Sequence, residues 1–200
     1  QVLRGFRVFQ HQFLKLLDSL LTCDVKSLVE GRQCYGLFCN EQGGVIDDCI
    51  VCRYEDRWLV VCNASNRQKV LDWLRAHAAG RQVQVADRTF ETAMLAIQGP
   101  SSLELLARKL PIGLEGLKRY RFTAGTFMGV PYTISRTGYT GEDGVELIVP
   151  AAVAPTLWRA VFGGGISGDA PVRPAGLGAR DTLRIEAAMP LYGQELHERV

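Results

Sequence analysis

The sequence has no long apolar run. Its longest uninterrupted apolar stretches are a handful of residues, far short of the roughly 18–20 residues that cross a bilayer. The first residues show neither the apolar core nor the small-residue cleavage site of a secretory signal. We therefore expect neither a membrane protein nor a secreted precursor, and no membrane partner.

The sequence also lacks an excess of positive charge. There are 23 Lys and Arg against 21 Asp and Glu, a formal net charge of +2, and neither half is strongly basic. A protein that follows a nucleic-acid backbone concentrates positive charge in one patch. We therefore expect no nucleic-acid partner, whereas binding of a small anion by one or two arginines is compatible with this composition.

Histidine is scarce, and all six cysteines lie in the first third of the chain. The three histidines are scattered without metal-ligand spacing. Cys49 and Cys52 form a C-x-x-C pair, but they lie in a predicted strand, where residues three apart point to opposite faces. The chain is long enough to bury a core without disulfides. We therefore expect no metal, and reduced, mostly buried thiols in a reducing compartment.

What is present is an ordinary globular composition, 47% hydrophobic and 22% charged. The apolar periodicity predicts helices and short strands. The predicted helices span residues 12–22, 65–79, 100–110, 152–162 (followed by a glycine loop at 163–165) and 174–188. The predicted strands span residues 45–52, 58–62, 82–86, 92–97, 122–127, 130–135 and 145–149. Hairpins and helices without strict βαβ alternation indicate an α+β fold, with pseudo-duplicated halves of approximately 1–98 and 99–200 and no linker.

A tight glycine turn leads into a strand that opens with two carboxylates, Asp47 and Asp48. Neighbours in a strand face opposite sides, so at most one of the two points into a given cavity. Either both flank the turn in solvent, or one faces a partly desolvated pocket and binds a cationic or proton-donating ligand. At the next strand-to-helix junction, Ser65 or Asn66 can cap the helix. Asn63 is left over and could face the same cavity as Asp48.

Residues 135–147 contain three glycines spaced three apart, which predict a long structured turn between strands. No helix opens after them and no Gly-Lys-Ser/Thr follows, so the turn is neither a dinucleotide site nor a P-loop. Glu146 lies inside an apolar strand, where a carboxylate is costly unless it is paired or hydrogen-bonded. It could form a structural ion pair, or it could bind a ligand ring rich in N–H groups.

The last predicted helix starts among small residues, whose free N–H groups favour an anion. Arg180 and Arg184 lie one turn apart on it. One of them could pair with Asp181 or Glu186 within the helix. The other could hold a ligand carboxylate in bidentate fashion.

Five blocks of the sequence occur in an order that is typical of one family. They are Tyr35 with residues 40–48, then residues 63–66, 98–100, 136–146 and 173–194. Together they closely resemble the aminomethyltransferase (T-protein) family of the glycine cleavage system, over about residues 14–195. The resemblance implies a T-protein-like folate-binding fold, with two interleaved mixed sheet and helix subdomains around a central cavity. It also implies that the family's N-terminal segment and C-terminal barrel domain are absent from these 200 residues.

The resemblance further implies a tetrahydrofolate-dependent transferase. In that family N5 of tetrahydrofolate attacks the aminomethyl group on the lipoyl arm of the H-protein. Ammonia leaves, and 5,10-methylenetetrahydrofolate and a dihydrolipoyl arm result. The implied co-substrate is tetrahydrofolate, the implied partner is lipoylated H-protein, and the implied location is the bacterial cytoplasm or the mitochondrial matrix.

The same resemblance implies roles for individual residues. Asp48 matches the catalytic aspartate, which orients the folate and assists proton movement near its reacting nitrogens. Glu146 matches the carboxylate that binds the pterin edge, and Arg180 matches a folate-contacting arginine. We expect these three side chains to share one cavity. Further positions lining the folate cavity are matched by Tyr35, Asn63, Tyr120 and Tyr139.

Two other functions stay open. One is a folate-binding module without transferase activity, in regulation or iron–sulfur assembly. Such relatives carry a Lys-Gly-Cys-Tyr-x-Gly-Gln stretch that this chain lacks, and they tend to lose the aspartate kept here as Asp48. The other is a folate-linked demethylase, or the folate half of a dimethylglycine or sarcosine oxidising enzyme, although the sequence contains no flavin-binding segment.

Overall fold

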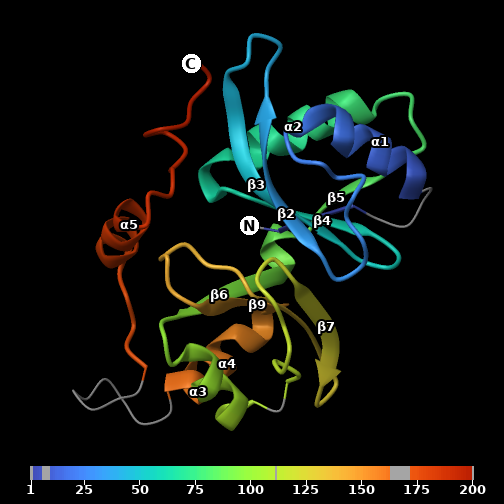
Figure 1. Cartoon of the computed structure of the whole chain (residues 1–200). Helices are drawn as coiled ribbons and strands as arrows, with labels where there is room; N and C mark the ends of the chain where they lie inside the picture. The colour runs from blue at the N-terminus through green and yellow to red at the C-terminus, as the bar shows by residue number, and fades with distance from the viewer. Residues whose placement is uncertain (1, 6–9, 111, 163–171, 200) are drawn as a thin grey trace. The chain divides into compact units, whose positions relative to one another are not determined.

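The chain forms two compact units, which contain residues 1–89 with 191–200 and residues 90–190 (Figure 1). The computed structural model describes residues 2–5, 10–110, 112–162 and 172–199. The glycine loop predicted at 163–165 lies outside these residues. That the two units are copies of one another stays a prediction. None of the helices in the described ranges is long and apolar enough to cross a membrane.

The first unit is an antiparallel five-stranded sheet in the order β2-β3-β4-β1-β5, with two helices. Its strands are β1 (Val2–Gly5), β2 (Gln33–Cys39), β3 (Val45–Arg53), β4 (Trp58–Cys62) and β5 (Val85–Asp87). Its helices are α1 (Gln10–Leu20) and α2 (Arg67–Ala78), the latter preceded by the short 3₁₀ turn η1 (Ala64–Asn66).

Both helices of the first unit pack on the same face of its sheet. Leu16 of α1 and Leu74 of α2 belong to one buried cluster with Val51 and Val60. The latter two are cross-strand partners on β3 and β4, so their side chains share a face. Burying this apolar face is the main stabilisation that the unit has available.

The second unit is an antiparallel four-stranded sheet in the order β6-β9-β8-β7. Its strands are β6 (Thr92–Gln98), β7 (Phe122–Phe127), β8 (Val130–Ser135) and β9 (Gly144–Pro150). Its helices are α3 (Ser102–Lys109), α4 (Ala154–Phe162) and α5 (Leu177–Glu186); short 3₁₀ turns are η2 (Thr89–Glu91), at the boundary between the units, and η3 (Ala151–Val153). Leu106 of α3 and Val161 of α4 pack with Val145 and Leu147 of β9, so α3 and α4 cover one face of this sheet.

The predicted α+β class is confirmed, and the bounds of β4, β7 and β8 are those expected. The strand predicted at 82–86 is displaced to Val85–Asp87 because pairing with β1 sets its register. The last helix starts later than predicted, at Leu177, because Gly176 is still extended. Strands β1 and β2 had not been predicted.

Candidate functional site

The two adjacent carboxylates of β3 lie on opposite faces of the first sheet. Cys49 and Val51 belong to the core cluster under α1 and α2, and the alternation of a strand places Asp47 on that face and Asp48 on the other. Asp47 is fully buried, with 0% of its surface exposed, and Asp48 is half-buried. The interpretation that leaves both in solvent is therefore wrong.

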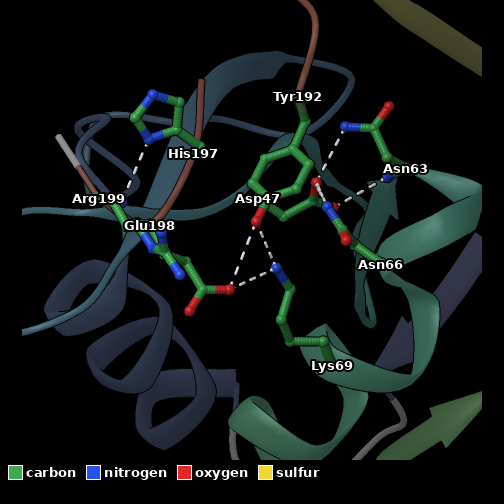
Figure 2. A network of polar contacts seen from close by, with 8 residues as sticks. All are labelled: Asp47, Asn63, Asn66, Lys69, Tyr192, His197, Glu198 and Arg199. Atoms are coloured by element: carbon green, nitrogen blue, oxygen red, sulfur yellow. Dashed lines mark hydrogen bonds and ion pairs between the residues drawn. The ribbon is translucent and has the colours of Figure 1, made fainter. Parts of the chain in front are cut away.

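Asp47 holds the turn that follows β4 (Figure 2). Its Oδ2 accepts a hydrogen bond from the backbone N–H of Asn63 at 3.0 Å, and its Oδ1 accepts one from Asn63 Nδ2 at 3.0 Å. Asn66 Nδ2 donates to the same Oδ1 at 2.6 Å. The expected capping role of Asn66 is therefore wrong, because its side chain makes no cap hydrogen bond and binds Asp47 instead.

Asn63 connects the two carboxylates. Its Nδ2 also donates to Asp48 Oδ1 at 2.5 Å, and the Tyr35 side chain forms a further hydrogen bond with Asp48. Tyr35 and Asp48 lie on the neighbouring strands β2 and β3. The first unit thus brings together three predicted site residues: Asp48, Asn63 and Tyr35.

The pKa of Asp48 is raised from its ordinary value of 3.8. Burial is the main cause, because it disfavours the charged form, and the negative charge of Asp47 adds to it. The hydrogen bonds from Asn63 and Tyr35 act in the opposite direction. A carboxylate whose pKa moves toward neutrality is better suited to exchange a proton at physiological pH.

Residues 191–199 form a C-terminal segment that belongs to the first unit and contacts the start of β3. The backbone N–H of Val45 donates to the carbonyl of His197 at 2.9 Å. Lys69 of α2 donates to Tyr192 Oη at 2.6 Å and to Glu198 Oε1 at 2.7 Å, as Figure 2 shows. The segment therefore ties α2 to the strand that carries both aspartates. Sequence reasoning missed this contact, whose two sides lie more than 120 residues apart.

Gly44, at the turn before β3, lies directly against that segment. A Cβ at this position would overlap the backbone carbonyl of Glu198. We expect Gly44→Ala to lower the free energy of unfolding by about 1–3 kcal/mol, because the backbone has to shift. Urea unfolding measures it, and Gly113→Ala is the matched control, since a Cβ there meets open space. Equal stability of the two variants would contradict the contact.

In the second unit, Glu146 lies on β9 between Val145 and Leu147, which face α3 and α4. Its side chain therefore points to the opposite face of the sheet, where it is half-buried. Thr137 Oγ1 donates to its Oε2 at 2.7 Å. Among the residues with described side chains, Glu146 forms no ion pair. The structural ion pair is thus not observed within the described residues, and no hydrogen bond to Oε1 is found among them.

The turn that carries Thr137 is held by its own polar contacts. Arg136 binds Asp143 in bidentate fashion, at 3.0 and 2.6 Å, and donates to the carbonyl of Leu117 at 2.7 Å. The Arg136–Asp143 pair raises the pKa of the guanidinium and lowers that of the carboxyl. Gln98 Nε2 donates to the carbonyls of Thr137 and Val145. These contacts fix the positions of Thr137 and Glu146. Sequence reasoning had assigned no role to Arg136, Asp143 or Gln98.

The two arginines of α5 differ in their partners. Arg184 is buried and pairs with Asp181 at 2.8 Å. The Arg180 guanidinium lies over the ring of Tyr139, 4.6 Å from its centre, and forms no ion pair within the described part of the chain. The Tyr139 hydroxyl donates to the carbonyl of Pro190. Arg180 is therefore the arginine of this pair that can bind a ligand carboxylate.

Tyr120 is exposed and precedes β7 with a positive φ of 55°. Its backbone N–H donates to the carbonyl of Arg136 at 3.1 Å, but its side chain forms no hydrogen bond or ring contact with Glu146 or Arg180 in the described structure. No group of three or more potential ligands among the described residues could hold a metal ion. The cavity shared by Asp48, Glu146 and Arg180 stays a prediction.

Comparison with known proteins gives consistent matches. The family model described as the GCVT N-terminal domain matches residues 2–200. An aminomethyltransferase of Moorella thermoacetica is 48% identical over 184 residues, which are 92% of this chain and 50% of that protein. The crystal structure of the glycine cleavage system aminomethyltransferase T of Bartonella henselae is similar with a TM-score of 0.86 and 31% identity, over 99% of this chain and 51% of that one.

A heterotetrameric sarcosine oxidase of Corynebacterium sp. U-96 is also similar, with a TM-score of 0.58 over 92% of this chain and 80% of that one. At 15% identity this likeness concerns the fold alone. The chain spans about half the length of the aminomethyltransferases it matches.

Proposed function

The chain belongs to the GCVT N-terminal domain family, and on that premise we propose that it is the tetrahydrofolate-binding part of an aminomethyltransferase of glycine cleavage. The proposed reaction transfers the methylene group of the aminomethyl-lipoyl arm of the H-protein to tetrahydrofolate. Ammonia, 5,10-methylenetetrahydrofolate and the dihydrolipoyl arm are the products. We also propose a cytoplasmic or mitochondrial-matrix location, and an origin of residues 1–98 and 99–200 by duplication.

The observation that carries this proposal is the polar group around Asp48. A half-buried carboxylate with a raised pKa, oriented by Asn63 and Tyr35, can hold a proton and release it. We assign Asp48 to orienting the reacting nitrogens of the folate and to moving the proton that the departing ammonia requires. Asn63 would keep the carboxylate in the orientation that this transfer needs.

The second unit supplies groups that suit the remainder of a folate. The pterin edge presents N–H donors, and Glu146 Oε1 can accept from them while Thr137 holds Oε2. The glutamyl tail presents a carboxylate, which a guanidinium binds in bidentate fashion. We assign the first contact to Glu146 and the second to Arg180, with Tyr139 under the guanidinium. Tyr120 is proposed to line the same site.

Replacing Arg180 tests the anion contact. We expect Arg180→Ala to weaken tetrahydrofolate binding by about 1.5–3 kcal/mol, the usual cost of losing a charge-assisted hydrogen bond. Isothermal titration calorimetry measures it. Arg108→Ala is the matched control, because Arg108 is exposed on α3 and, within the described residues, pairs with Glu104 alone. Unchanged affinity in Arg180→Ala would remove Arg180 from the site.

One experiment in two steps tests the function. The 200-residue chain is first titrated with tetrahydrofolate, and the protein is then assayed with aminomethylated H-protein for 5,10-methylenetetrahydrofolate. Binding followed by product formation is the expected result. Binding without product would favour the non-catalytic folate module, and transfer of an intact methyl group from an N-methylated glycine to give 5-methyltetrahydrofolate would favour the demethylase. Absence of binding would contradict all three.

A further inference from the structure

Cys23 and Cys34 lie against each other in the first unit, at a place that the proposed reaction does not use. Cys23 follows α1 and Cys34 lies on β2. Cys34 Sγ donates a hydrogen bond to Cys23 Sγ, and the two sulfurs are 2.8 Å apart. Both side chains are half-buried, whereas Cys49, Cys52 and Cys62 are buried. Both residues of the pair therefore keep part of their surface exposed to solvent.

The backbone holds the two sulfurs in this position. The N–H of Thr22 donates to the carbonyl of Leu37 at 3.1 Å, and the N–H of Leu37 donates to Thr22 Oγ1 at 3.0 Å. Gly36 leaves the space that Cys23 fills, since a Cβ there would lie 2.6 Å from Cys23 Sγ. A sulfur–sulfur bond is about 2.05 Å long, so the pair can close by a movement of less than about 1 Å.

The hydrogen bond makes the two thiols chemically unequal. It lowers the pKa of Cys23, against the effect of burial, because the donated S–H stabilises the Cys23 thiolate. The same bond, together with burial, raises the pKa of Cys34. The thiolate is the nucleophilic form of cysteine, and we therefore expect Cys23 to react first.

We propose that Cys23 and Cys34 form a reversible disulfide modification site, closed by hydrogen peroxide. The Cys23 thiolate attacks the peroxide oxygen, the O–O bond breaks, and a Cys23 sulfenic acid and hydroxide form. Cys34 sulfur then displaces the hydroxyl of the sulfenic acid, and its S–H proton leaves with that hydroxyl as water. The two thiols lose two electrons in total, and the peroxide is reduced to water. A low-molecular-weight thiol reverses the reaction by exchange.

Mass spectrometry of the peroxide-treated 200-residue chain tests this proposal without any assay of turnover, so its outcome is independent of the proposed function. We expect the intact mass to fall by about 2 Da and to recover with dithiothreitol. Tryptic digestion without reductant should link the peptide of residues 16–26 to that of residues 33–53, and fragmentation should place the bond at Cys34. A bond to Cys39, or no link at a dose that oxidises Cys39, would overturn the proposal.

Three variants separate the two roles, with circular dichroism as the check on folding. In Cys34→Ser we expect a Cys23 sulfenic acid that a 1,3-dicarbonyl reagent traps, because the resolving thiol is gone. In Cys23→Ser we expect the same reagent to trap Cys34 at least about tenfold more slowly than it traps Cys23 in Cys34→Ser. Cys39→Ser is the matched control, since Cys39 is equally half-buried but has no sulfur partner in the described structure. It should leave the link unchanged, and equal trapping in the first two variants would contradict the assignment of Cys23 as the nucleophile.

Discussion

Asp48→Asn is expected to reduce formation of 5,10-methylenetetrahydrofolate by about 10²–10⁴-fold, the range that a positioned acid–base group contributes. The amide keeps the shape of the carboxylate and still accepts the hydrogen bond that Asn63 donates at 2.5 Å. It cannot hold a transferable proton. The loss should therefore fall on kcat, with tetrahydrofolate affinity reduced far less. The assay uses aminomethylated H-protein and the enzyme that contains these 200 residues.

The same variant should not be less stable at neutral pH. Because the folded-state pKa of Asp48 lies above 3.8, the folded chain binds this proton more tightly than the unfolded chain does. The free energy of unfolding consequently falls as pH rises from about 3.8 through the raised pKa. Asp48→Asn removes this titrating group, so the free energy of unfolding of the variant should depend less on pH between about 3.8 and the raised pKa. Urea unfolding at several pH values measures the difference.

Asp56→Asn is the matched control for both measurements. Asp56 lies in the turn between β3 and β4 and pairs with the neighbouring Arg57 at 2.8 Å. The Asp56→Asn variant should have a turnover within a factor of two of that of the unmodified protein. Near-normal turnover in Asp48→Asn, or an equal loss in Asp56→Asn, would remove Asp48 from the proposed mechanism.

The sequence predicted elements well where local pattern decides them. Strands β4, β7 and β8 are apolar or β-branched runs bounded by turns, and their bounds were as expected. Strand β1 has only four residues, and it is a strand because β4 and β5 pair with it from both sides. Pairing of that kind joins segments that are distant in the sequence, and no local sequence pattern predicts it.

The same distinction applies to the candidate site. Asp48 could be singled out because it opens a strand, whereas the role of Asp47 depends on Asn63 and Asn66, which lie 16 and 19 residues away. The choice between Arg180 and Arg184 could not be made from spacing, since acidic residues lie near both. Burial in the structure distinguishes the two arginines, because Arg184 is 4% exposed and paired with Asp181.

Asp47→Asn should be the most destabilising single change at this site. The carboxylate accepts three hydrogen bonds in a fully buried position. An amide presents one oxygen only, so its N–H groups face at least one N–H donor of Asn63 or Asn66. We expect the free energy of unfolding to fall by about 2–6 kcal/mol, because two buried donors then lack an acceptor and each costs about 1–3 kcal/mol. Urea unfolding measures the change. Asp72→Asn is the control, because Asp72 is exposed on α2 and its side chain accepts a hydrogen bond from Gln68 alone among the described residues.

Asp47→Asn should change the pH dependence of turnover, whereas Asp48→Asn should lower turnover itself. Removing the charge of Asp47 lowers the pKa of Asp48, because that charge is one of the causes that raise it. At a temperature where the variant is folded, we expect turnover to persist and the acid limb of its pH profile to move to lower pH. An unshifted profile would contradict the electrostatic effect of Asp47 on Asp48. The expected shift would distinguish the two adjacent carboxylates by function, with Asp47 mainly stabilising the turn after β4 and Asp48 assigned to the proposed reaction.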